Sequence, residues 1–247
     1  MNYSIKRPVV SIITVCYNEK NIENTCKSIV FQNFKDYEWI VIDGGSTDET
    51  INVLNKYKEH INVLISEKDN GIYDAMNKGI RLANSEWIIF MNGGDRFFDE
   101  NVFKKVFSLN LDYDIMFADG ANDIYNTKHP LPIDKNGQIV FHKFFCDNSL
   151  CHQATFIKRE LFERIGFYDT SYEIIADHVF NYIALRDFKV TYKYIPEMIS
   201  IVDIGGVSAK NKAKLLKEQF RFRKNRKDIL VEIFIIFNLF KKRFFKK

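Results

Sequence analysis

Short, unbroken apolar runs alternate with amphipathic stretches over the first 91 residues. The apolar runs predict buried strands at Val9–Tyr17, Tyr37–Asp43, Ile61–Ser66 and Trp87–Met91. Between them, apolar positions at helical spacing predict helices over Asn21–Phe31, from Ser46 to Tyr57, and over Ile72–Leu82. Ser46 and Glu49 have the spacing of a capping box, which would start the second helix at Ser46. This alternation with short connections predicts an α/β fold with a doubly wound, mostly parallel central sheet.

The pattern is less regular after Asp95. It predicts helices over Asn101–Ser108, Arg159–Ile165, Ala176–Arg186 and Ser208–Arg226. It predicts strands over Asp114–Ala118, Gln153–Ile157, Lys189–Ile195 and Met198–Val202, the last two separated at Pro196. A polar loop or hairpin is expected over Asn122–Gln138, and a glycine turn over Asp203–Ser208. We therefore expect one domain over residues 1–208, followed by a basic helical region over 209–247.

Charge is distributed unevenly along the chain. Residues 210–247 contain 14 Lys or Arg against three acidic residues, a net charge of +11, which leaves −7 on the first 209 residues. Ile229–Phe240 is apolar nearly all round, but as a helix it would be about 18 Å long, too short to span a bilayer core of about 30 Å. An apolar helix flanked by Lys and Arg suits an anionic membrane surface. The alternative is a helix that packs on the domain or on a second subunit.

Cysteine usage and the N-terminus bear on location. Cys16, Cys26, Cys146 and Cys151 form no CxxC pair, so we expect reduced thiols and no zinc site. Lys6-Arg7-Pro8 leads into a strand and not into a long apolar segment, which argues against a signal peptide. We therefore expect a cytoplasmic protein, held peripherally on the cytoplasmic face of the inner membrane by its tail.

Three acidic residues follow predicted strands. Asp43 ends the second strand, Asp69 follows the third, and Asp95 follows the fourth after Gly93-Gly94. The carboxyl ends of parallel strands meet at one sheet edge, where α/β folds bind ligands, so these carboxylates should converge. Carboxylate oxygens together with substrate phosphates suit Mg²⁺ or Mn²⁺. No GxGxxG or Walker A motif is present. A nucleotide held through base, ribose and a metal-bridged diphosphate fits better than NAD or ATP in a Gly-rich loop.

Ordered motifs then add a family resemblance. VSIITVCYNE, VIDGGSTDET, SEKDNGIYDAMNKGI and WIIFMNGGD, followed by CHQATFIKRELFERIGFYD, IADHVFNYIAL and DIGGVS, resemble family 2 glycosyltransferases with the GT-A fold. The resemblance covers about residues 8–208. It implies an inverting transferase that uses a nucleotide-diphospho-sugar, with 1–95 binding the nucleotide and 96–208 the acceptor.

The resemblance also implies roles for individual residues. Asp43 resembles the acid that binds the donor's base, and Thr14, Tyr17 and Glu19 would line the same pocket. Donor contacts are implied for Asp69, Asp74, Lys78, Asn92, Gly93 and Gly94. Asp95 resembles the last acid of the DxD metal motif, but Gly93 stands in place of the first acid. Asp177 resembles the general base, with His152 and Gln153 beside the acceptor or the diphosphate.

Local roles are the alternatives at several of these positions. Asp43 would only stabilise the turn before the next helix, Asp177 would cap its helix, and His152 would be a buried structural histidine. Asp74 and Lys78 have the i,i+4 spacing of a surface ion pair.

The implied chemistry is consistent with these residues. One carboxylate takes the acceptor proton as the hydroxyl attacks C1, and a divalent cation offsets charge on the leaving diphosphate. The acceptor is expected to be a lipid-linked glycan or an oligosaccharide, in polysaccharide or lipopolysaccharide O-antigen synthesis. A nucleotidyltransferase would need a basic Gly-rich loop where CYNEKN stands. A non-enzymatic polyanion-binding protein acting through the tail is the other alternative; nucleic acid is not the expected partner, because RNA-binding aromatic motifs are absent.

Overall fold

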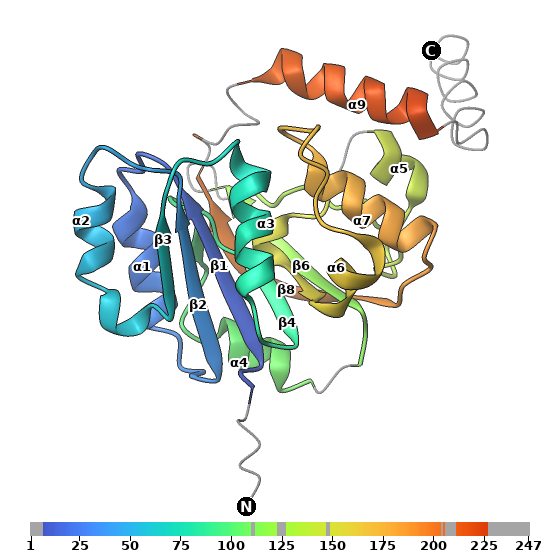
Figure 1. The fold of residues 1–247 in the computed structure, drawn as a ribbon. Helices are drawn as coiled ribbons and strands as arrows, with labels where there is room; N and C mark the ends of the chain where they lie inside the picture. Colours follow the sequence, from blue (N-terminus) through green and yellow to red (C-terminus); the bar gives the residue numbers. More distant parts are fainter. Residues whose placement is uncertain are drawn as a thin grey trace, which may run out of the picture.

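A computed structural model describes residues 7–109, 112–122, 127–146, 149–203, 205 and 211–226. Within these residues one eight-stranded mixed sheet has the order β3-β2-β1-β4-β7-β6-β8-β5, with helices on both faces (Figure 1). The strands are β1 (Val10–Cys16), β2 (Tyr37–Asp43), β3 (Val63–Ser66), β4 (Trp87–Phe90), β5 (Arg96–Phe97), β6 (Ile115–Asn122), β7 (Thr155–Lys158) and β8 (Tyr192–Val202). The first four pair in parallel, as the alternating pattern predicts.

Helices cover both faces because the strands are apolar on both. The α-helices are α1 (Ile22–Val30), α2 (Thr50–Asn55), α3 (Ile72–Leu82), α4 (Val102–Phe107), α5 (Phe141–Cys146), α6 (Glu160–Ile165), α7 (Ala176–Arg186) and α9 (Lys212–Arg226), with 3₁₀ turns η1 (Lys58–His60) and η2 (His152–Ala154). Alternate residues of β1 enter different cores: Ile13 packs with α3, α6 and α7, and Ile12 packs with α1, α2 and α4. The sheet is thus the middle layer of three.

The second half of the sheet brings distant segments together. β7 runs antiparallel between β4 and β6, β6 pairs in parallel with β8, and β5 pairs antiparallel with β8. The strands expected on either side of Pro196 are one strand, β8. The register jumps there, since Ala118 is opposite Ile195 and Asp119 is opposite Met198. Proline has no N–H for the ladder and is accommodated in this bulge.

The expected helix start at Ser46 is wrong. α2 begins at Thr50, with no side-chain cap from Glu49. The Ser46 hydroxyl instead donates to Asp43, and Asp48 Oδ1 accepts the backbone N–H of Thr50 at 3.0 Å. The turn is therefore closed by Asp43, which is described with the site below.

A polar loop or hairpin was expected over Asn122–Gln138. In and beside this segment, isolated antiparallel bridges join Ala121 to Lys128 and Ile133 to Ile139.

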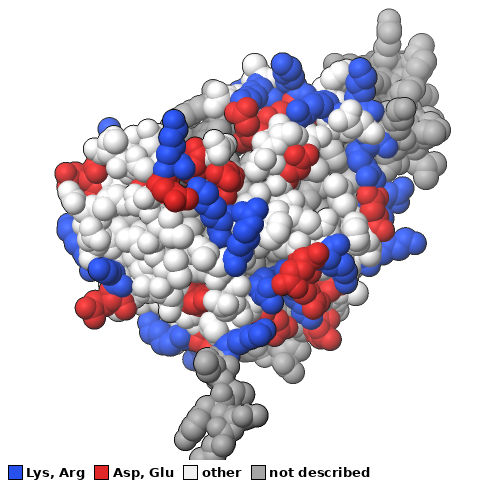
Figure 2. Space-filling view, in the orientation of Figure 1, with Lys and Arg blue, Asp and Glu red and all other residues white. Residues whose placement is uncertain are grey.

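α9 packs into the main core. Phe222 is buried against Phe145 and Tyr182, and Glu218 is also buried. Figure 2 shows Lys and Arg side chains gathered along the outer side of this helix, at the upper edge of the view. Among the helices of the described residues, none has the length and apolar character needed to cross a bilayer. The apolar run 229–240 and the basic C-terminal segment lie outside the described residues.

Candidate active site

Asp43 is fully buried at the end of β2 and is held by protein donors. Its Oδ2 accepts the backbone N–H groups of Gly45 and Ser46, at 3.1 and 2.9 Å, and the Ser66 hydroxyl at 2.7 Å. Its Oδ1 accepts the Ser46 hydroxyl and faces the Cys16 thiol. A carboxylate enclosed in this way cannot also meet a nucleobase. In this structure Asp43 therefore fastens the turn after β2, and does not form the base contact expected from the sequence.

Thr14 is enclosed in the same way. Its side chain has no exposed surface, and its hydroxyl accepts the indole N–H of Trp39 at 3.0 Å. Thr14 supports the wall between β1 and β2, so the expected contact between its side chain and a nucleotide is not available.

Tyr17 and Asp69 face the space above these strand ends. Tyr17 is exposed, and Asp69 Oδ1 accepts the backbone N–H of Gly71 at 2.9 Å. A Cβ placed on Gly44 would lie 2.5 Å from Asp69 Oδ2 and 3.5 Å from Tyr17 Cβ. Only glycine at position 44 therefore leaves room for the Asp69 carboxylate over the end of β2. Unlike Asp43 and Thr14, neither of these two side chains is fully buried.

Asp74 and Lys78 form a polar patch on α3. Asp74 Oδ2 accepts the backbone N–H of Asn70 at 3.0 Å, and Lys78 Nζ lies 2.7 Å from Glu67 Oε1 and 3.7 Å from Asp74 Oδ2. Both residues thus help to hold the Glu67–Gly71 turn that carries Asp69. The expected i,i+4 ion pair is present, in addition to any ligand contact.

The turn after β4 depends on its two glycines. A Cβ on Gly93 would lie 3.0 Å from Glu19 Cγ. Gly94 has a φ of 92°, and a Cβ on it would lie 3.3 Å from Glu19 Cδ and 3.4 Å from Asp203 Oδ2. Side-chain atoms of Glu19 and Asp203 therefore lie close to the backbone of this turn. Close approach of this kind is what glycine permits.

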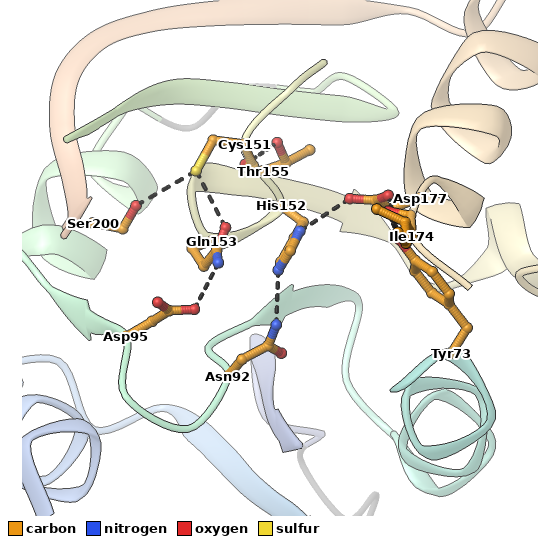
Figure 3. Close-up of polar contacts among 10 residues, drawn as sticks. All are labelled: Tyr73, Asn92, Asp95, Cys151, His152, Gln153, Thr155, Ile174, Asp177 and Ser200. Atoms are coloured by element: carbon orange, nitrogen blue, oxygen red, sulfur yellow. Dashed lines mark hydrogen bonds and ion pairs between the residues drawn. The ribbon is translucent and has the colours of Figure 1, made fainter. Parts of the chain in front are cut away.

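Asp95 ends this turn and is nearly buried (Figure 3). Its Oδ2 accepts the Gln153 amide at 2.6 Å, and its Oδ1 accepts the backbone N–H of Asp203 at 2.9 Å. Burial raises the pKa of Asp95 to about 6, partly offset by these two bonds. Gln153 is itself oriented by the Cys151 thiol, which lies 3.3 Å from its Oε1. Asp95 thus ties the end of β4 to η2 and to the end of β8.

His152 and Asp177 form a pair on the opposite side of the site (Figure 3). His152 Nδ1 lies 3.0 Å from Asp177 Oδ2, while its Nε2 lies 2.9 Å from the Asn92 amide nitrogen at the end of β4. The Tyr73 hydroxyl donates to Asp177 Oδ1 at 2.6 Å. Asp177 lies in the first turn of α7 and does not cap it, so the capping alternative is wrong.

The charges of this pair stabilise each other. Burial would raise the pKa of Asp177, but the hydrogen bond and charge of His152, together with the Tyr73 hydroxyl, hold it below its usual value. Burial would lower the pKa of His152, but Asp177 more than offsets this, so it lies above its usual value. The pair can therefore take up a proton and keep it next to a negative charge.

Asp95 is the one side chain that the sequence proposes for a metal. Each of its oxygens accepts one hydrogen bond and has a second lone pair. No group of three or more His, Cys, Asp or Glu suited to a metal ion is found in the part of the chain that the structure describes. Asp95 alone would fit a Mg²⁺ or Mn²⁺ ion as one carboxylate ligand, and the other ligands would come from the diphosphate and water.

Tyr73 was not predicted from the sequence as a site residue, and Asp203 and Glu218 were not predicted as residues that hold the site in place. Tyr73 lies inside the motif SEKDNGIYDAMNKGI, but its contact with Asp177 joins positions 104 residues apart. Glu218 accepts the backbone N–H groups of Glu173 and Ile174, just before α7. No local pattern marks such long-range bonds.

The model of glycosyl transferase family 2 matches residues 11–166 of the chain. The chain belongs to this family. A PGL/p-HBAD biosynthesis glycosyltransferase of Mycobacterium bovis (strain BCG / Pasteur 1173P2) is 28% identical over 209 residues, covering 81% of this chain and 79% of that protein. An uncharacterized glycosyltransferase of Mycobacterium tuberculosis (strain CDC 1551 / Oshkosh) is 31% identical over 184 residues, covering 70% and 67%. This family 2 protein is therefore a glycosyltransferase.

Solved structures share its fold. The crystal structure of S. aureus TarS 1–349 in complex with UDP matches with a TM-score of 0.65 at 16% identity, covering 79% of this chain and 60% of that one. The mannosyltransferase PcManGT from Pyrobaculum calidifontis, in complex with GDP-Man and Mn²⁺, matches with a TM-score of 0.61 at 20% identity, covering 80% and 57%. This family 2 chain thus spans about three fifths of each of them. The GT-A fold predicted from the sequence is confirmed.

Proposed function

We propose that this glycosyltransferase moves a sugar from a nucleotide-diphospho-sugar to a hydroxyl of a lipid-linked glycan or an oligosaccharide, with inversion at C1. The observation that carries the proposal is the Asn92–His152–Asp177 chain. It joins the end of β4, the expected donor side, to a buried carboxylate on α7, the expected acceptor side. A proton-accepting pair next to the donor edge is what direct displacement by a hydroxyl requires.

The comparisons support the substrate class. Two fold neighbours were solved with UDP and with GDP-Man, so a nucleotide-linked donor suits this sheet edge. A relative is named for PGL/p-HBAD biosynthesis, which favours a role in assembling a bacterial surface glycan, such as a polysaccharide or O-antigen. On the donor side, Tyr17 and Asp69 would meet the nucleoside, and Asn92, Gly93 and Gly94 would lie beside the diphosphate.

Metal assistance is part of the proposal. Asp95 would hold Mg²⁺ or Mn²⁺ together with the diphosphate, and the cation would offset negative charge on the leaving group. Single displacement needs one base and no covalent intermediate. The chain itself would bind the donor at the ends of β1, β2 and β4.

A donor-binding panel tests the proposal. The full chain is titrated with UDP-, GDP- and dTDP-sugars in Mg²⁺, Mn²⁺ or EDTA, beside Asp95→Asn, Asp177→Asn and the surface control Asp112→Asn. We expect one donor to bind with metal, Asp95→Asn to weaken binding at least tenfold, and Asp177→Asn to bind normally but to transfer at least 100-fold more slowly. The folded wild type binding no sugar nucleotide would contradict the proposal.

Location is proposed from charge. The basic residues of α9 and of the segment after it suit an anionic bilayer surface, which would place the enzyme on the cytoplasmic face of the inner membrane, near a lipid-linked acceptor.

A further inference from the structure

Asp177 is poorly placed to meet a sugar hydroxyl directly. Its side chain is 11% exposed, and each of its carboxylate oxygens already accepts a donor, Tyr73 at Oδ1 and His152 at Oδ2. The His152 side chain is 21% exposed and lies between the carboxylate and the end of β4. An acceptor that approaches the donor edge therefore reaches the imidazole before it reaches the carboxylate.

The hydrogen bonds define which nitrogen is available. Asp177 can only accept while it is ionised, so His152 Nδ1 carries the hydrogen of this bond. Nε2 of the neutral ring then has a lone pair, which accepts from the Asn92 amide nitrogen at 2.9 Å. The lone pair thus points to the end of β4, where the donor's C1 is expected.

Asn92 suits both protonation states of the ring. Its Oδ1 is buried and has no hydrogen-bond partner among the described residues. Rotation of the amide would bring this oxygen to Nε2–H once the ring is protonated, whereas the present orientation serves the neutral ring. An unpartnered acceptor next to Nε2 is otherwise an unfavourable arrangement for a buried amide.

We infer that His152 is the group that takes the acceptor proton, and that Asp177 is a positioning residue that acts through it. The inference rests on the proposed function. The acceptor hydroxyl replaces the Asn92 amide at Nε2. As the hydroxyl oxygen forms its bond to C1, the bond from C1 to the diphosphate oxygen breaks, the bonding electrons leave with the nucleoside diphosphate, and the proton passes to Nε2. The carboxylate of Asp177 then stabilises the imidazolium, with Tyr73 holding the other oxygen in place.

Chemical rescue distinguishes this assignment from a direct carboxylate base. Release of nucleoside diphosphate from the donor found in the binding panel, with water as acceptor, is followed for wild type, His152→Ala, His152→Gln and Asp177→Asn. We expect His152→Ala and His152→Gln to lose at least 100-fold in kcat with donor affinity within about twofold. Imidazole at about 50 mM should raise the kcat of His152→Ala at least tenfold, and the gain should be proportional to the concentration of neutral imidazole.

Controls separate a chemical role from a structural one. His60→Ala, a histidine in the exposed η1 turn, should keep wild-type activity and gain nothing from imidazole. His152→Gln keeps an N–H that can face Asp177, so it tests the result if His152→Ala folds poorly. Tyr73→Phe should lower kcat by about three- to tenfold without changing KM, because it only loosens Asp177.

The wild-type pH profile is a second readout. Burial lowers the pKa of His152, but the hydrogen bond and charge of Asp177 raise it, and the charge of Asp95 adds to this. The charge of His152 in turn lowers the pKa of His129. Activity should therefore rise with pH through a single ionisation above the usual histidine value, and this limb should vanish in His152→Gln. The assignment is overturned if His152→Ala stays within tenfold of wild type while Asp177→Asn is inactive, or if imidazole rescues nothing. If the wild type neither binds nor cleaves any donor, the proposed function itself has failed.

Discussion

Buried polar residues carry most of the organisation of this site. Asp43, Asp95 and Asp177 are all nearly inaccessible, yet each accepts hydrogen bonds that join different parts of the chain. The same residue type thus fastens a turn at Asp43, joins three segments at Asp95 and orients an imidazole at Asp177. Removing a single partner of such a group leaves a desolvated charge, which costs more than the bond itself contributes.

His178 should make stability depend on pH. It is buried and stacked on Phe144, with ring centroids 4.9 Å apart, and burial lowers its pKa to about 4. The unfolded chain therefore binds this proton more readily, and the free energy of unfolding should fall as pH drops from 6.5 toward 4, by up to about 3 kcal/mol. In His178→Phe, which keeps the stack, this dependence should be largely lost in thermal melts. Equal slopes for wild type and variant would contradict it.

Gly44 is the second residue with a sharp expectation. In Gly44→Ala the new methyl would meet Asp69 Oδ2, so the carboxylate must move away from Tyr17. We expect donor affinity to fall about tenfold, with little change in the melting temperature, because Asp69 can turn toward solvent. Calorimetric titration with the nucleoside diphosphate of the bound donor measures this. Unchanged affinity would show that Asp69 does not contact the nucleoside.

At the scale of elements, much of the first half could be predicted from the sequence, whereas some short elements of the second half could not. The strand Tyr37–Asp43 and the helix Ile72–Leu82 have the predicted bounds, because the buried apolar residues of each recur at the spacing typical of its secondary structure. α5 and β5 escaped prediction, since a six-residue helix and a two-residue strand depend on tertiary partners. The Ser46 cap failed because Asp43 competes for the same hydroxyl.

The packing of α3 on β1 depends on Gly79. A Cβ there would lie 2.4 Å from Ile13 Cγ2. Alanine in a helix interior normally stabilises by up to about 1 kcal/mol relative to glycine, but the overlap should reverse the sign and cost about 1–3 kcal/mol. Urea unfolding of Gly79→Ala would show a lower midpoint with an unchanged m-value. A higher midpoint would mean that α3 is not held this close to the sheet.

α9 braces the turn that leads into α7. Glu218 accepts the N–H groups of Glu173 and Ile174 at 2.9 and 3.0 Å, three and two residues before the start of that helix. Glu218→Ala should lower the free energy of unfolding by about 1–3 kcal/mol and reduce kcat while leaving donor affinity intact. Lys217→Ala, on the exposed side of the same helix, is the matched control. If Glu218→Ala lost as much donor affinity as kcat, the effect of Glu218 would not be confined to the turn before α7.

For the whole molecule, the fold predicted from the sequence is confirmed, but the sequence did not reveal which of the strand-end carboxylates are buried. Asp43 and Asp69 look alike in the sequence, since each follows a strand, and only tertiary burial distinguishes them. The expected domain boundary at 208 likewise depends on tertiary burial that the sequence does not reveal. Residues 212–226 bury Phe222 in the main core, so we propose that the folded domain extends to Arg226 and that most of the membrane binding comes from the segment after it.

Two shortened chains test this division. A chain ending at Arg226 should keep its donor affinity and melting temperature, but bind vesicles of 30% anionic lipid at least tenfold more weakly than the full chain, given about 1 kcal/mol for each basic residue at the surface. A chain ending at Ser208 should melt at lower temperature and lose transfer. Co-sedimentation with neutral vesicles is the control. Equal binding by the full chain and the chain ending at Arg226 would exclude the tail as the anchor.

The position of β7 also affects how the chain is made. β1 to β4 are complete by residue 90, but the strand that covers the free edge of β4 is Thr155–Lys158. During synthesis, Trp87–Phe90 is therefore an open, wholly apolar strand edge while at least 65 further residues are added, about 3 to 13 seconds at ribosomal rates. Such an edge pairs readily with other chains. The yield of this enzyme should consequently depend on translation speed and on chaperones that bind nascent chains, more than on the stability of the finished protein.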